Sequence, residues 1–107
     1  MTRFSYRDCV REGLLRAAEP SPERARASLV AADRWLAETA VNLKGKAFNS
    51  TLMSSYIAMF HSARAILIHD GVRETSAYCI ARYLEAKYAD RGLLEPLWVQ
   101  RLDQYRD

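Results

Sequence analysis

The sequence has little glycine or proline, only two cysteines and only two histidines. Four glycines and three prolines among 107 residues are too few for the many tight turns of an all-β domain. Alanine, the residue with the highest helix propensity, is abundant. Apolar residues make up 50% and charged residues 27%, which excludes the composition of a disordered chain. We therefore expect an all-α protein.

Several classes of site and location are disfavoured by what is missing. The longest apolar stretch is broken well before the roughly 20 residues that a membrane-spanning helix needs. No glycine-rich phosphate loop is present, and no carboxylate stands three or four residues from a histidine. We therefore expect no cofactor, no bound metal and no membrane contact. Cys9 and Cys79 lie far apart without a CxxC motif, which predicts reduced, buried cysteines in a soluble cytoplasmic protein.

The net charge of +3 and the isoelectric point of about 9.1 make the chain mildly basic. This charge permits an anionic partner such as RNA but does not require one. The arginines in and just before the first two predicted helices are Arg3, Arg7, Arg11, Arg16, Arg24, Arg26 and Arg34. The first four recur at intervals near four, so they predict a basic stripe that either contacts an RNA backbone or is simply a solvated face.

The spacing of apolar and capping residues predicts about five helices joined by short loops. Ser21 before Pro22 and Glu23 is a strong helix-start pattern, and Gly45 and Gly71 are suited to helix ends. The predicted helices cover residues 4–18, 22–45, 47–70, 76–90 and 96–107. Short connections favour antiparallel neighbours, so we expect an up-and-down helical bundle forming a single domain over residues 1–107.

The helix predicted over residues 47–70 is expected to be the buried centre of the bundle, because apolar residues cover almost all of its faces. The last predicted helix reaches Asp107 without a capping residue. Either this helix frays there or the sequence is a fragment truncated at its C-terminus.

His61 and Arg64 are the best-placed polar pair, because residues three apart share one helix face. An imidazole could exchange protons there while a guanidinium holds a phosphate oxygen. The structural alternative is a half-buried His61 bonded to a tyrosine, serine or backbone oxygen, with Arg64 bridging to a carboxylate of a neighbouring helix. Arg64 and His69 point about 140° apart on an ideal helix, so they do not converge on one substrate, and His69 is better explained as a cation near a helix C-terminus.

One stretch of the sequence resembles the HEPN family. It has the pattern Tyr56-x-x-Met59-Phe60-His61-x-Ala63-Arg64-Ala65-x-Leu67, and similarity extends through the residues after the following glycine turn. The resemblance implies a bundle of about five helices that commonly dimerises. Many members are metal-independent ribonucleases, and many are toxins encoded beside a minimal nucleotidyltransferase antitoxin. The alternative that the resemblance leaves open is a non-catalytic dimeric module that docks such a nucleotidyltransferase.

The family's catalytic signature is an arginine and a histidine four to six residues apart on a late helix. No histidine follows Arg101 here, so we expect the sequence to stop just before the signature, with Arg106 at its edge. Ala77 is a second departure, since relatives often carry a histidine there. The residues expected to act are His61, Arg64 and Arg106 in catalysis, Arg73, Arg82 and Arg101 in RNA binding, and Tyr56, Phe60, Trp98 and Tyr105 in structure or dimerisation. The partners expected are a second copy, a nucleotidyltransferase-type antitoxin and RNA.

Overall fold

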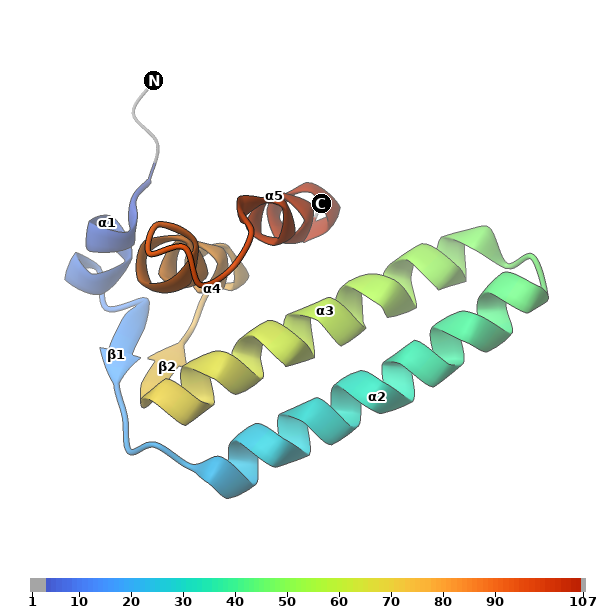
Figure 1. The fold of residues 1–107 in the computed structure, drawn as a ribbon, viewed down its shortest axis with the longest axis horizontal. Coiled ribbons are helices and arrows are strands. Elements are labelled where there is room, and N and C mark those ends of the chain that lie inside the picture. The colour runs from blue at the N-terminus through green and yellow to red at the C-terminus, as the bar shows by residue number, and fades with distance from the viewer. Residues whose placement is uncertain (1–3, 107) are drawn as a thin grey trace.

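The computed structural model describes residues 4–106, except for the side chains of residues 105 and 106. In this part of the chain, five α-helices account for most of the fold and a short two-stranded sheet completes it (Figure 1). The elements are α1 (Tyr6–Arg11), β1 (Leu15–Ala17), α2 (Pro22–Lys44), α3 (Phe48–Asp70), β2 (Val72–Glu74), α4 (Ala77–Leu84), the π-helical turn η1 (Glu85–Ala89) and α5 (Pro96–Arg106). The predicted all-α bundle is confirmed.

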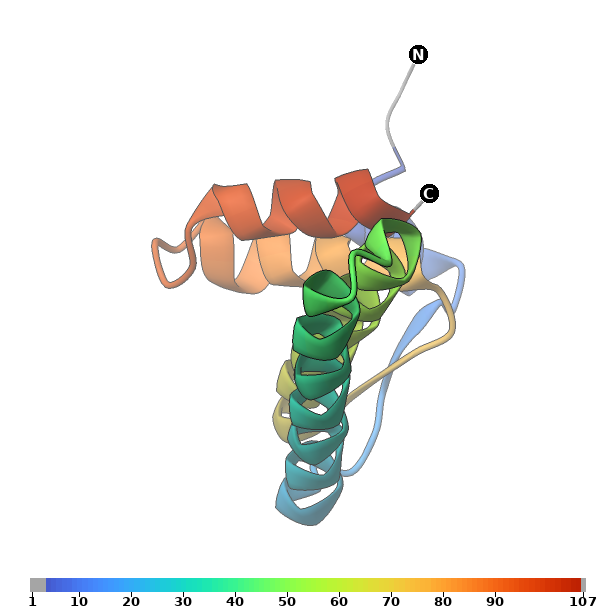
Figure 2. The same ribbon diagram turned by 90° about the vertical axis from the view of Figure 1, so that its right-hand side faces the viewer.

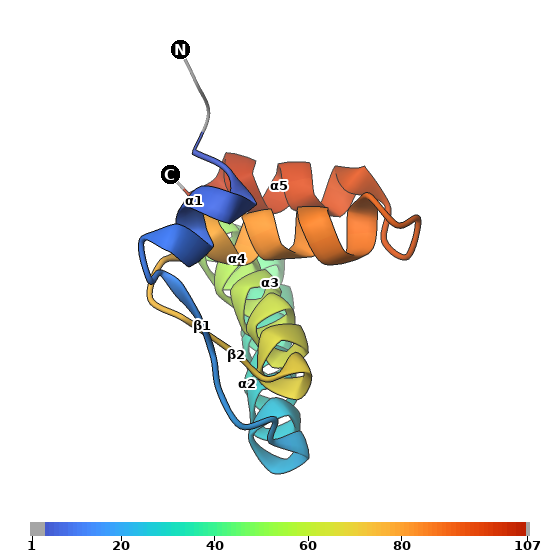
Figure 3. The same ribbon diagram turned by 90° about the vertical axis from the view of Figure 1, so that its left-hand side faces the viewer.

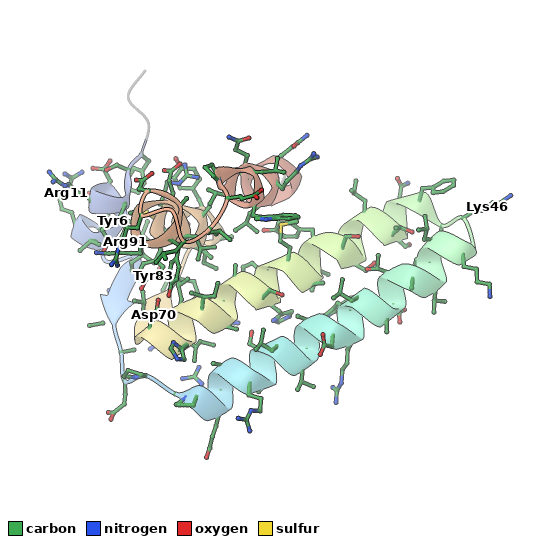
Figure 4. All side chains as sticks on the ribbon, viewed as in Figure 1. Tyr6, Arg11, Lys46, Asp70, Tyr83 and Arg91 are labelled. Atoms are coloured by element: carbon green, nitrogen blue, oxygen red, sulfur yellow. A yellow bond between two sulfur atoms is a disulfide. The ribbon has the colours of Figure 1, made fainter. Side chains whose placement is uncertain are left out.

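The two longest helices, α2 and α3, form an antiparallel hairpin (Figure 1). At the start of α2, the Ser21 hydroxyl accepts a hydrogen bond from the Arg24 backbone N–H and proline follows in the first turn, as the sequence predicts. Gly45 ends α2, and Lys46 turns the chain with a φ of 61°. This turn lies at the far end of the hairpin, and we call the region around it, residues 41–53, the tip (Figure 4).

Helices α4 and α5 lie side by side and cross the hairpin at a steep angle (Figure 2). Helix α4 passes through η1 into the loop before Pro96, which begins α5. The core lies where these helices meet the second half of α3, with Leu67, Ile80 and Leu102 buried. No helix among the described residues combines the length and apolarity that crossing a membrane requires.

The N-terminal segment differs from its prediction as one helix over residues 4–18. Helix α1 begins with a capping box between Ser5 and Asp8 and is already complete at Arg11. Gly13 then takes a left-handed φ of 73°, and Leu15–Ala17 becomes β1. This strand pairs antiparallel with β2, a distant partner that local spacing cannot reveal (Figure 3). The predicted stripe of arginines is therefore divided: Arg7 and Arg11 lie on α1 and Arg16 on β1, while Arg3 lies outside the described residues.

The cysteines are buried, as predicted, but the prediction that they are reduced is wrong. Cys9 of α1 and Cys79 of α4 form a disulfide, with their Cα atoms 5.8 Å apart. The two residues are 70 positions apart in sequence, and only the packing of α1 against the first turn of α4 brings them together. The bond ties the N-terminal segment to the core.

Burial along α3 is uneven. In its second half Ala63, Ala65 and Leu67 are buried, which agrees with the expected central helix. At the tip, however, Phe48 is 65% exposed and Met53 is 64% exposed. The tip extends past α5 in Figure 1, and among the described residues α2 is the main element against which these apolar side chains can pack.

Candidate functional site

His61 and Arg64 lie one turn apart on α3 and line a common cavity of about 280 Å³. Arg24 of α2 lines the same cavity, which we call the His61 cavity. The Ser28 hydroxyl of α2 donates a 2.7 Å hydrogen bond to the His61 carbonyl oxygen and so fixes the two helices against each other at this point. The cavity therefore combines an imidazole and two guanidinium groups on a rigid helix pair.

The surroundings of His61 favour a fixed ring. Its imidazole is half-buried and meets the Phe60 ring edge-on, with the ring centroids 5.8 Å apart. Phe60 in turn packs against the main core. This placement agrees with the expectation of a half-buried histidine, while the ring still lines the cavity and can meet a ligand there.

Arg64 forms an ion pair with β2. Its Nε atom lies 2.9 Å from the Glu74 Oε1 atom, and the Glu74 side chain is almost fully buried. The sequence predicted a carboxylate partner as the structural alternative for Arg64, and the structure supplies one from a strand rather than a helix. Because Arg64 also lines the His61 cavity, the ion pair holds its guanidinium beside that cavity.

A second cavity of about 400 Å³ adjoins the first and shares Arg24 and Arg64 with it. Arg73 of β2 joins them, so three arginines line this space, which we call the arginine pocket. Two glutamates, Glu19 and Glu74, also line it. Of the three arginines that the sequence predicted as RNA contacts, Arg73 is thus the one that lies next to the His61 cavity.

Arg82 and Arg101 line neither of these two cavities. The Arg82 side chain is 1% exposed, forms an ion pair with Asp103 of α5 and lies 4.7 Å from the centre of the Tyr78 ring. It therefore stabilises the contact between α4 and α5, and its burial makes it the least suited of the three arginines to RNA binding. Arg101 is half-buried on α5. The roles of these two residues in RNA binding stay predictions.

The predicted dimer residues fall into two groups. Tyr56 and Phe60 are partly buried against the core, with their ring centroids 6.4 Å apart. Trp98 is 54% exposed on α5 and is available for a contact with another chain. The side chains of Tyr105 and Arg106, predicted for dimerisation and catalysis, lie outside the described residues.

Arg64 and His69 line different cavities, as the angle between them on α3 predicts. His69 lies in the last turn of α3, and its Nδ1 atom is 3.1 Å from an Asp70 carboxylate oxygen. The other oxygen of Asp70 accepts hydrogen bonds from the hydroxyl groups of Tyr83 and Tyr88. In Figure 4, Asp70 and Tyr83 lie at the opposite end of the hairpin from Lys46.

This carboxylate–tyrosine cluster was not predicted, because its members are 13 and 18 residues apart. Burial tends to raise the pKa of Asp70, but the hydrogen bonds from Tyr88, His69 and Tyr83 outweigh it and lower the pKa below its usual value. Burial, together with the hydrogen bond to Asp70, raises the pKa of Tyr88 to about 12. The same two causes raise the pKa of Tyr83 beyond its usual range. The cluster thus favours an ionised Asp70 held by neutral tyrosines.

The model of the HEPN domain family matches residues 25–106, most of the chain from the first turn of α2 through α5. The chain belongs to the HEPN family. No curated protein and no solved structure matches it. The HEPN match leaves out α1 and β1, so the disulfide and the β1–β2 pairing attach an additional N-terminal segment to the HEPN helices.

Proposed function

We propose that this HEPN domain is a metal-independent endoribonuclease, the toxin component of a toxin–antitoxin pair, that acts as a homodimer. The observation that supports this function is the His61 cavity, in which an imidazole from α3 lies beside arginines from α2 and α3. Guanidinium groups bind phosphate through paired, charge-assisted hydrogen bonds. An imidazole transfers protons near neutral pH.

The chemistry that these groups can carry out is attack by a ribose 2′-hydroxyl on the adjacent phosphate. In this scheme His61 takes the proton from the 2′-oxygen, which then bonds to phosphorus. Arg24 and Arg64 stabilise the negative charge that builds up on the phosphate oxygens. The bond from phosphorus to the 5′-oxygen breaks, and that oxygen leaves with a proton from an acid. The products are a 2′,3′-cyclic phosphate and a 5′-hydroxyl end.

One cavity contains one histidine, whereas the scheme uses a base and an acid. In a symmetric dimer, a second copy supplies the same groups across the twofold axis. The exposed apolar side chains support such an association. They include Trp98, Leu93 and Leu97 near α5 and Phe48, Leu52 and Met53 at the tip. Patches of this kind are costly to leave in water.

The experiment that tests cleavage is incubation of the full chain with cellular RNA and a strong chelator, followed by analysis of the RNA ends. The proposal predicts fragments with 2′,3′-cyclic phosphate and 5′-hydroxyl ends. RNA that stays intact at high protein concentration would rule out metal-independent cleavage.

The homodimer is tested separately by sedimentation at micromolar concentration. We expect a dimer for the unmodified chain. We also expect weaker association when Trp98 is replaced by serine, because its large apolar surface is exposed in one copy. Sedimentation as a monomer at high micromolar concentration contradicts the dimer.

A second candidate function is a non-catalytic module that binds a nucleotidyltransferase. The ion pair between Arg64 and Glu74 favours it, because a guanidinium already paired with a carboxylate has less positive charge to offer a phosphate. This candidate predicts intact RNA together with a stable complex when the chain is co-expressed with a minimal nucleotidyltransferase. RNA cleavage that depends on His61 would rule it out.

A further inference from the structure

The arginine pocket carries more positive charge than its own carboxylates neutralise. Three arginines and two glutamates line it, which leaves a net charge of +1. Glu74 is engaged with Arg64, whereas Arg24 and Arg73 have no ion-pair partner among the described residues. Two guanidinium groups at the same cavity are thus available to an anion.

Both of these arginines are placed where an isolated cation is unfavourable. Arg24 lies in the first turn of α2, next to the positive end of the helix dipole. Arg73 lies directly opposite Arg16 in the β1–β2 ladder, and like charges in that relation destabilise a sheet. The Arg16 Nε atom donates to the Gly13 carbonyl oxygen, which leaves its positive charge unneutralised. An anion bound in the pocket relieves the repulsion at both positions.

The walls of the pocket are rigid. The Ala18 N–H donates to the Gly71 carbonyl oxygen at 2.8 Å, and the Ser21 N–H donates to the Ile68 carbonyl oxygen at 3.3 Å. These bonds fix the segment before α2 against the end of α3. A Cβ atom at Gly71 would lie 2.8 Å from the Ala18 oxygen, so the two segments are in the closest contact that the backbone allows. A pocket held in this way needs little rearrangement to receive a ligand.

We propose that the arginine pocket binds a phosphate monoester. A monoester carries about two negative charges near neutral pH and exposes three unesterified oxygens, so it can pair with the guanidinium groups of Arg24 and Arg73 at the same time. The pocket is also more enclosed than the His61 cavity. An enclosed pocket suits the terminal phosphate of an RNA strand better than a phosphodiester in the middle of one. The monoester is either the terminal phosphate of an RNA strand, an assignment that rests on the proposed function, or the phosphate of a free nucleotide.

The first test uses short 2′-O-methyl oligoribonucleotides, which cannot be cleaved. It compares the binding of an oligonucleotide that carries a terminal phosphate with that of the same oligonucleotide carrying a terminal hydroxyl. Fluorescence anisotropy of the full chain at fixed salt measures their affinities, with the 5′ and 3′ ends examined in turn. We expect one phosphorylated end to bind at least about tenfold more tightly than its hydroxyl counterpart. Arg24→Gln and Arg73→Gln should each abolish this advantage. Arg26→Gln is the matched control, since Arg26 is exposed on α2 and does not line the pocket.

The second test uses adenosine monophosphate, inorganic phosphate and adenosine as direct ligands in calorimetry. Binding of the two phosphates but not of adenosine, with dependence on Arg24 and Arg73, supports the pocket even if RNA does not bind. That outcome would contradict the ribonuclease while leaving the monoester site intact. Equal affinities for all four oligonucleotide ends, together with no binding of either phosphate, would overturn the monoester site whether or not the chain cleaves RNA. Thermal melting of each variant checks that it is folded.

Discussion

The two ends of the α2–α3 hairpin differ in what holds them. At its base, α3 packs against β2 and the core around α4, and the Asp70 cluster links it to α4 and η1. The disulfide joins α1 to α4 of the same core. At the tip, within the part of the chain that the structure describes, the two helices pack mainly on each other, and their large apolar side chains are exposed. The comparison shows that an apolar helix face does not by itself indicate an intramolecular core. At the tip it marks a surface suited to association.

Hydroxyl groups contribute to cohesion on the tip side of the hairpin. Ser54 is buried between the helices, and its hydroxyl accepts a 2.8 Å hydrogen bond from the Thr39 hydroxyl of α2. It donates in turn to the Ser50 carbonyl oxygen at 2.8 Å. Hydrogen bonds between small polar residues therefore contribute to the contact between α2 and α3 near the tip, whereas the core at the base is mostly apolar.

The largest effect is expected from removing the disulfide. The paired change Cys9→Ser and Cys79→Ser opens a covalent loop of 70 residues, which should lower the free energy of unfolding by about 4 kcal/mol. Urea denaturation of the variant and of the unmodified chain, with and without reductant, measures this loss. A loss below about 1 kcal/mol would show that packing of α1 against α4 holds this helix in place without the disulfide.

Two leucines on α3 make the comparison direct. Leu67 is fully buried at the base, so Leu67→Ala should cost about 2–5 kcal/mol. Leu52 is exposed at the tip, so Leu52→Ala should cost under about 1 kcal/mol in the monomer. Urea denaturation at low protein concentration checks both. Equal losses would mean that the tip is packed in the folded monomer.

The Asp70 cluster gives the base a dependence on pH. The pKa of Asp70 is lowered on folding, so its contribution is present above the unfolded pKa of about 4 and is lost as the pH falls through the folded value. The pKa of Tyr88 is raised to about 12, so its contribution is present below pH of about 10 and is lost as the pH rises towards 12.

Replacement of the carboxylate tests this assignment. Asp70→Asn should cost about 1–2 kcal/mol at neutral pH, because partly exposed hydrogen bonds to an ionised group are lost. Melting temperatures across the pH range should show a weaker dependence in the variant at both the acid and alkaline ends. If the melting temperatures of the variant and of the unmodified chain change with pH in the same way, the pH dependence comes from other groups.

The smallest effect is expected from the helix caps. Ser21 accepts a hydrogen bond from the Arg24 backbone N–H, so Ser21→Ala should cost about 1 kcal/mol. Ser76 occupies the equivalent position before α4 but makes no side-chain capping bond, so Ser76→Ala is the matched control and should cost less than half as much. Thermal melting measures both, and the reverse order would contradict the observed capping geometry.

Features that depend on neighbouring residues could be predicted from the sequence. Ser21 with Pro22 marks the start of α2, Gly71 the end of α3 and Pro96 the start of α5. The β1–β2 pairing and the disulfide could not be predicted, because each joins segments more than 50 residues apart. The disulfide depends on how α1 packs against α4.

The candidate site shows the same division. The shared helix face of His61 and Arg64 follows from their spacing of three. Arg24 lines the same cavities as Arg64, and Glu74 forms an ion pair with Arg64, but both come from other elements, which spacing does not reveal. The buried position of Arg82 could not be predicted either, because its ion-pair partner, Asp103, lies 21 residues later in the sequence.

The most direct test of the account compares RNA cleavage by His61→Gln and His69→Gln in the presence of chelator. The two histidines lie on the same helix but line different cavities. We expect His61→Gln to keep its melting temperature within a few degrees while cleavage falls by about 100-fold or more, and His69→Gln to cleave at nearly the unmodified rate. A His61→Gln variant that melts at a much lower temperature yet cleaves as fast per folded molecule would contradict the catalytic role and leave His61 as a structural residue.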